Sequence, residues 1–250
     1  MTAGDDLTPR GAFPTTRRSV VAAIGDPDSE VRRDATNALV TAYWRPVYGH
    51  LRYRWRMQPA DAEDLTQEFF HRAAAQGFFE DYDPARARFR TFVRTCLDRF
   101  VANARRDEGR LKRGGGLAAV PLDFDEVERE LAAREGPGAE DDADAWFDRE
   151  WIRGIFTDAV ADLRAGCRDT PREIRFVVFE RYDLTPPTDA DRPSYRALAD
   201  ELDIPVTQVT NHLAWARREL RRRVLDRVRA VAGSDAEFRT EAEELFGAGP

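Results

Sequence analysis

The fold of this chain is decided by residues 194–228, which read SYRALADELDIPVTQVTNHLAWARRELRRRVLDRV. A short apolar helix is expected from Tyr195 to Leu202, and the tight turn Asp203-Ile204-Pro205 follows it. Beyond the turn, apolar residues recur at helical spacing and predict a second helix with one buried face: Val206, Val209, Leu213, Ala216 and Leu220. The pattern is typical of a helix-turn-helix.

Two small details support this interpretation. Ala199 stands four residues before the turn, where steeply crossing helices need a short side chain. Asp203 tolerates a left-handed backbone better than most residues. In such a unit the N-terminal half of the second helix enters a DNA major groove. Here that half carries Gln208, Thr210 and Asn211, which can form hydrogen bonds to base edges.

Length and composition fit one large or two small domains. The chain has 250 residues, of which 42% are hydrophobic and 34% charged. Cys96 and Cys167 show no metal-binding spacing and suggest no disulfide scaffold, which favours a reducing compartment. The sequence shows no leader pattern and no apolar run of membrane length. We therefore expect a soluble cytoplasmic protein that does not bind a membrane.

The net charge of −7 hides a strong segregation of charge along the chain. Residues 123–150 hold twelve acidic residues and three arginines, a net charge of −9, whereas residues 212–229 hold seven arginines and two acidic residues, a net charge of +5. Basic surface of this kind attracts phosphates even when the whole chain is acidic. Lys112 is the single lysine, so only the clustering of arginines is informative.

Helical periodicity dominates the rest of the chain, and no convincing strand or repeat is found. In the first block Leu39, Tyr43, Val47 and Leu51 recur at a helical period. A second helical block begins near Trp151, and an acidic helical patch lies in residues 233–250. The sequence predicts an all-α protein with two small helical domains joined by an acidic linker, the second domain carrying the helix-turn-helix.

The first block contains an acidic helix, residues 61–70, which read DAEDLTQEFF. Leu65, Phe69 and Ala73 would point inward at helical spacing. One outer face collects polar residues: Asp61, Asp64, Glu68 and Arg72. From spacing alone, a solvated helix surface is the favoured interpretation.

The following helix, residues 89–107, reads FRTFVRTCLDRFVANARRD and interleaves arginines with aromatic residues. Aromatic rings stack on unpaired bases and guanidiniums hold phosphates, which is the chemistry of single-strand capture. A core helix with a basic solvated side explains the pattern at least as well when the helix is taken alone.

The order of these segments resembles an extracytoplasmic-function (ECF) sigma factor of bacterial RNA polymerase. The resemblance rests on DAEDLTQEFF, FRTFVRTCLDRFVANARRD and a helix-turn-helix ending HLAWARRELRRR. It covers roughly residues 17–113 and 148–230. It implies the following division of the chain: a flexible tail (1–16), sigma region 2 (17–113), the acidic linker (114–147), sigma region 4 (148–230) and a C-terminal tail (231–250).

The resemblance also implies partners and site residues. Region 2 would dock on the β′ clamp helices of the core polymerase through Asp61, Asp64, Gln67, Glu68 and Arg72. It would recognise and melt the −10 promoter element with Phe89, Arg90, Phe92, Arg94, Asn103 and Arg106. Region 4 would touch the β flap and read the −35 element with Gln208, Thr210, Asn211, Arg217, Arg218, Arg221 and Arg222. An anti-sigma factor is a further partner that the family allows.

Other functions remain open from the residues themselves. An autonomous helix-turn-helix regulator that binds operator DNA as a dimer fits residues 194–228 equally well. An enzyme is not expected, because no histidine pairs with a ligand motif and Gly114-Gly115-Gly116 lacks the lysine or serine of a phosphate loop. We expect no catalytic residue, cofactor or metal. The acidic linker either screens the domains from stray DNA, occupies the polymerase channel or, as favoured, is a solubilising tether.

Overall fold

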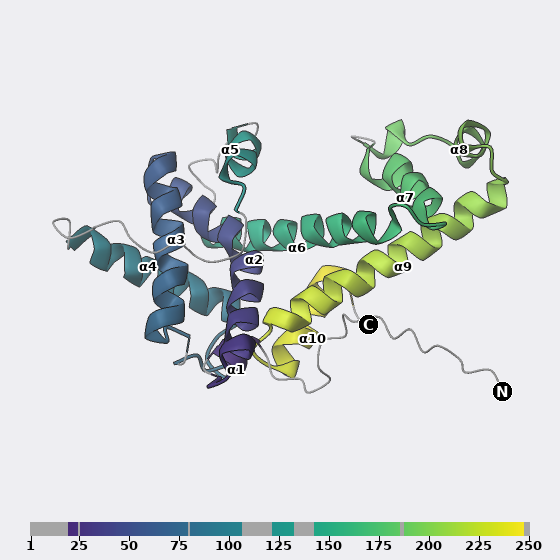
Figure 1. Ribbon diagram of the computed structural model, residues 1–250. Helices are drawn as coiled ribbons and strands as arrows, with labels where there is room; N and C mark the ends of the chain where they lie inside the picture. Colours follow the sequence, from purple (N-terminus) through teal and green to yellow (C-terminus); the bar gives the residue numbers. More distant parts are fainter. Residues whose placement is uncertain are drawn as a thin grey trace, which may run out of the picture.

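The computed structural model describes residues 20–24, 26–79, 81–106, 122–132, 143–185 and 188–247. Within these residues every regular element is a helix, which confirms the all-α class (Figure 1). The helices are α1 (Val20–Ile24), α2 (Ser29–Tyr53), α3 (Pro59–Gln76), α4 (Phe89–Arg106), α5 (Phe124–Ala132), α6 (Ala143–Cys167), α7 (Glu173–Phe179), a π-helical turn (Glu180–Leu184), a 3-10 turn (Asp189–Asp191), α8 (Tyr195–Leu202), α9 (Val206–Val231) and α10 (Asp235–Phe246). The tail predicted at residues 1–16 lies outside the described residues.

A first core forms around α2. Its predicted stripe is buried, with Leu39, Tyr43, Val47 and Leu51 at most 1% exposed. Helices α3 and α4 pack on it through aromatic side chains, and Phe69 lies edge-on to Phe100 with ring centroids 5.7 Å apart. Helix α3 begins at a proline, which suits the first helical turn, and ends at a left-handed glycine cap (φ 64°). These two ends fix where the acidic helix begins and stops.

A second, smaller core joins the end of α6 to α7, α8 and the first half of α9. Helix α8 spans the predicted residues, and the Ser194 hydroxyl caps it by accepting a hydrogen bond from the Ala197 N–H at 3.1 Å. Asp203 adopts the left-handed conformation expected of it (φ 51°, ψ 47°). The turn lets Leu198 of α8 and Leu213 of α9 enter the same core, where each is 1% exposed.

The two cores share helices. The start of α6 packs on α2, and its end reaches the second core. Helix α9 packs against α6 and also extends from one core to the other (Figure 1). Val209 and Leu213 of α9 lie in the second core, whereas Val224 and Val228 lie in the first. The two cores are therefore connected by two continuous helices, α6 and α9, and not by a loop.

The tether predicted at 114–147 is wrong for its described parts, residues 122–132 and 143–147. Helix α5 buries Phe124, Val127 and Leu131 in the first core, and the Phe124 ring lies 5.0 Å from that of Tyr48. Trp146 at the start of α6 is 8% exposed and packs in the same core. The apolar stripe of this segment outweighs its acidic composition, because the carboxylates point away from the core and pair with arginines of α2.

The C-terminal tail is also part of the fold. Its predicted helical patch is α10, which lies beside the end of α9 (Figure 1). Phe238 and Ala242 are buried in the first core, at 8% and 4% exposure. None of the described helices is long and apolar enough to cross a membrane.

Candidate nucleic-acid interface

The first half of α9 presents polar side chains outward. Gln208, Thr210 and Asn211 are exposed, while Val209 between them is fully buried. This follows from the helical period, which turns every third or fourth residue of α9 toward the second core. Val206, expected on the buried face, is instead 45% exposed, because it is the first residue of the helix and lies beyond the core. The structure leaves all three candidate base contacts accessible to solvent.

The arginines that follow on α9 differ in their surroundings. Arg217 forms two hydrogen bonds to Asp183, each of 2.9 Å, and Arg222 bonds to Glu219 at 2.6 Å and Asp226 at 2.8 Å. Arg221 lies over the ring of Phe246, 4.6 Å from its centroid. Arg218 is exposed. To bind DNA, Arg217 and Arg222 would have to exchange these carboxylates for phosphates.

The acidic face of α3 forms as its spacing predicts. Asp61 and Asp64 are exposed, and Gln67 lies half-buried beside them. Arg72 donates to Glu68 at 2.5 Å, and its guanidinium lies over the Phe100 ring. The opposite side of α3 is buried, so this face is a rigid polar surface that a partner can reach.

The start of α4 is enclosed. Phe89 is fully buried against Tyr43, Phe79 and Tyr82, so in this conformation its ring is a core residue and cannot stack on a base. Phe92 is half-buried against Tyr82, with ring centroids 5.3 Å apart. The resemblance assigned both rings to the −10 element, but the aromatic cluster below α4 draws them inward.

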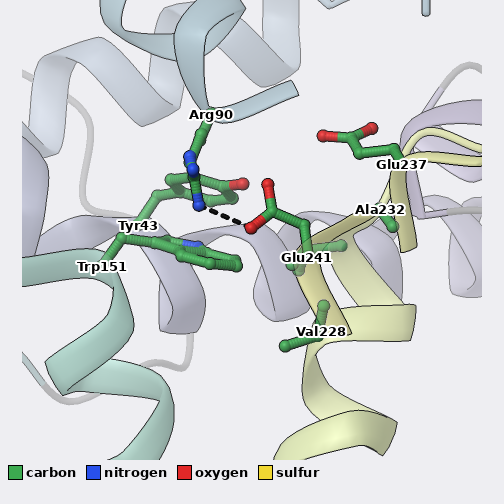
Figure 2. Close-up of a pocket in the computed structure, with 8 residues that line it drawn as sticks. Tyr43, Arg90, Trp151, Val228, Ala232, Glu237 and Glu241 are labelled. Carbon is green, nitrogen blue, oxygen red and sulfur yellow. Dashed lines mark hydrogen bonds and ion pairs between the residues drawn. The ribbon is translucent and has the colours of Figure 1, made fainter. Parts of the chain in front are cut away.

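The first two arginines of α4 are paired with carboxylates rather than exposed. Arg90 is 5% exposed and donates to Glu241 of α10 at 2.6 Å, as Figure 2 shows. Arg94 pairs with Asp144 of α6 at 2.8 Å. Burial of these guanidiniums contradicts the expectation that they face solvent, and its physical cause is the acidic surface that α6 and α10 place over them.

The far end of α4 is open. Asn103 and Arg106 are both exposed, as a DNA contact requires. The structure adds Arg105, whose guanidinium lies 4.7 Å from the centre of the Trp55 ring. The six residues predicted for the −10 element therefore fall into two groups: a covered start, which comprises Phe89, Arg90, Phe92 and Arg94, and an accessible end, which comprises Asn103 and Arg106.

Sequence reasoning missed the glutamates that cover α4. Glu237, Glu241 and Glu244 stand at i, i+4 and i+7 on α10, a spacing that places them along one side of a helix. That stripe is visible in the sequence, but nothing local indicates which distant arginines it meets. Arg88, just before α4, pairs with Glu244 at 2.5 Å.

Comparison with known protein families identifies a match in the first half of the chain. Residues 39–111 match the family Sigma-70 region 2, a segment that spans the second half of α2 with α3 and α4. No curated protein and no solved structure matches the chain. The matched segment includes the acidic face of α3 and the whole of α4, with both its covered start and its accessible end. Residues 39–111 of this chain therefore carry a sigma-70 region 2.

Proposed function

We propose that this chain is an ECF-type sigma factor, which binds core RNA polymerase and recognises the −10 and −35 promoter elements without chemistry of its own. The observation that carries the proposal is the presence, on one chain, of region 2 and of a helix–turn–helix segment with Gln208, Thr210 and Asn211 exposed. A region 2 without a second reading helix would leave the −35 element unrecognised.

The core-binding surface is the polar face of α3, Asp61, Asp64, Gln67, Glu68 and Arg72. Its accessible carboxylates suit a basic partner surface such as the β′ clamp helices. The exposed Asp61 and Asp64 give the face its negative charge, and the Arg72–Glu68 pair fixes its shape. The support is the exposure of this face within the matched family segment.

The −10 element is assigned to α4. Asn103 and Arg106 are accessible at once, and Arg90 and Arg94 are available after their carboxylate partners leave. Aromatic rings interleaved with arginines suit an unpaired strand, which offers both bases and phosphates. The −10 contact therefore requires a rearrangement at the start of α4.

The −35 element is assigned to the first half of α9. Gln208, Thr210, Asn211 and Arg218 would meet base edges, and the remaining arginines at 217, 221 and 222 would meet phosphates. The same domain would touch the β flap. Polymerase supplies a second anchor, so region 4 alone is expected to bind DNA weakly.

Run-off transcription with bacterial core polymerase and a library of promoter fragments tests the proposal. Wild-type protein should give promoter-dependent transcripts, and Asp64→Arg should abolish them because it reverses the charge of the core-binding face. Asp34→Arg is the matched control, since Asp34 is an exposed carboxylate of α2 outside that face. Asn211→Ala should weaken −35-dependent transcription by roughly 5- to 150-fold, the worth of a good base contact.

The outcome that contradicts the proposal is clear-cut. Transcripts that survive Asp64→Arg at the level of Asp34→Arg would remove the α3 face as the polymerase contact. Tight, dimeric operator binding by the chain alone, with no effect on core polymerase, would instead establish an autonomous regulator.

A further inference from the structure

Helix α10 places a row of carboxylates against the start of α4. Glu237, Glu241 and Glu244 lie along one side of the helix, while Phe238 and Ala242 beside them are buried in the first core. The apolar stripe fixes α10 to the molecule, and the acidic stripe is thereby held over α4.

Glu237 occupies the N-terminus of α4. One of its oxygens accepts the Phe89 N–H at 2.6 Å, and the other accepts the Tyr82 hydroxyl at 2.9 Å and the Gly233 N–H at 2.8 Å. The free N–H groups and the dipole at a helix N-terminus favour an anion at this place. A side chain from the other end of the chain supplies that anion.

Glu241 and Glu244 form ion pairs with the two guanidiniums beside this N-terminus, those of Arg88 and Arg90. Arg90 donates to Glu241 at 2.6 Å and to Glu244 at 3.4 Å, and its Nε lies 3.2 Å from Asp148 of α6. Arg88 donates to both oxygens of Glu244, at 2.6 and 2.5 Å. Figure 2 shows Glu241 reaching from α10 to Arg90, below which lies the ring of Trp151.

The covered groups are those that a nucleic-acid backbone uses. A helix N-terminus, two guanidiniums and neighbouring aromatic rings bind phosphates and bases in single-strand sites. We propose that α10 is an internal competitor for nucleic-acid phosphates, which holds the start of α4 closed until α10 leaves. This inference rests on the assignment of α4 to the −10 element, since it states how that same site is regulated.

The ion pairs between α10 and the start of α4 are weak enough in net free energy for a phosphate to replace the carboxylates. A buried ion pair gains little net stability, because desolvation of both charges offsets their attraction. Burial raises the pKa of Glu241 to about 7, which shows how poorly this position favours its charged form. A phosphate that stays partly in solvent would meet Arg88 and Arg90 without that penalty. The acidic stripe is therefore replaceable by a polyanion.

The connection to α9 allows the release. Helix α9 ends at Val231, and Ala232 is already extended (φ −73°, ψ 133°), followed by Gly233. Rotation in residues 232–234 moves α10 away without unwinding α9. The release exposes Phe238 and Ala242, so the closed state remains the resting state in the absence of a competing anion.

The test compares Glu244→Arg with Glu243→Arg in the full chain. The two variants change the net charge equally and at neighbouring positions, but only residue 244 faces Arg88 and Arg90. The two measurements are the affinity for a labelled single-stranded oligodeoxynucleotide of mixed sequence, without polymerase, and the hydrogen exchange of α10 amides. Glu244→Arg should bind about tenfold more tightly than Glu243→Arg and exchange faster in α10.

Each other outcome overturns the inference. Equal affinity of the two variants would show an effect of net charge alone, and faster exchange without tighter binding would show that α10 covers no nucleic-acid site. Tighter binding without faster exchange would show that the introduced guanidinium itself adds the contact. Circular dichroism of both variants confirms folding, and single-stranded DNA added to the wild type provides a measurement free of substitutions, since it should speed exchange in α10.

Run-off transcription with the same proteins separates this inference from the proposed function. If none of the three proteins gives promoter-dependent transcripts while Glu244→Arg still binds single strands more tightly, the sigma assignment fails and the closure by α10 stands. If all three support transcription and bind single strands equally, the closure fails and the sigma assignment stands.

Discussion

The ring of Trp146 lies so close to Gly49 that a Cβ added to the glycine would stand 1.9 Å from the Trp146 Cη2 atom. Gly49 is in α2, and Trp146 is near the start of α6. The missing side chain lets the indole settle against the α2 backbone. This contact secures the start of α6, and with it Asp144 and Asp148, over α4.

Gly49→Ala should lower the free energy of unfolding. The added methyl overlaps a buried indole, and overpacking of this kind costs about 1–3 kcal/mol. Gly154→Ala is the control, because a Cβ at Gly154 meets nothing within 4 Å. That variant should gain about 0.5–1 kcal/mol from helix propensity. Urea denaturation measures both, and equal stabilities would disprove the packing argument.

Gly233→Ala should loosen α10. A Cβ at Gly233 would stand 2.1 Å from the Tyr82 ring, which is itself held between Phe89 and Phe92. The ring or the start of α10 must then shift, and the Glu237 contacts to Tyr82 and Phe89 weaken. Hydrogen exchange should rise in α10 and at the first turn of α4 but not in α8. Unchanged protection of α10 would contradict this interpretation of the contact.

Stability should fall with rising pH through the titration of Glu241. The groups that face this carboxyl are Tyr43 of α2, Arg88 and Arg90 at the start of α4, and Glu237 and Glu244 of α10, and Asp148 of α6 contacts the same Arg90. Burial raises its pKa from 4.5 to about 7, so the folded chain retains a proton that the unfolded chain releases. The contribution is complete below about pH 4.5 and is lost as the pH rises to about 7.

The slope from this one group is at most about 1.4 kcal/mol per pH unit. Because Glu241→Gln cannot ionise, it should show a flatter dependence of unfolding free energy on pH between these limits. Denaturant titrations at several pH values measure the difference between wild type and variant. Parallel curves for the two proteins would show that Glu241 titrates normally.

Both cysteines should react slowly with thiol reagents in the folded chain. Burial raises the pKa of Cys96 to about 11, and that of Cys167 is raised by burial as well. The thiolate is the reactive form, and at pH 8 only about one Cys96 side chain in a thousand carries it. Alkylation followed by mass spectrometry should show slow labelling that becomes fast in denaturant. Rapid labelling of native Cys96 would rule this out.

The parts of the fold that sequence predicted are local. The stripe from Leu39 to Leu51, the helix from Tyr195 to Leu202 and the left-handed Asp203 each depend on neighbours within a few residues. Helical period, capping and turn chemistry fix such features before any distant contact forms. For the same reason the exposed face with Gln208 and Asn211 follows directly from the spacing of Val209 and Leu213.

The parts that sequence missed depend on contacts between distant segments. Arg90 and Glu241 are 151 residues apart, and nothing near either residue indicates the other. Helix α5 was missed because carboxylates surround its apolar stripe of Phe124, Val127 and Leu131. Arg45 and Arg52 of α2 donate hydrogen bonds to carboxylates of α5. The acidic residues that suggested a tether therefore hold the segment against α2.

Because α9 is one continuous helix, a tilt at its end in the first core displaces its start in the second core. Val224 lies in the first core and Asn211 stands thirteen residues before it, a distance of about 20 Å along a helix axis. A tilt of about 10° at the anchored end therefore moves Asn211 by about 3.5 Å. That displacement is close to the rise of one base pair, about 3.4 Å. Under the proposed function, a small change where α9 meets the first core would therefore shift Asn211 by about one base-pair step along the DNA.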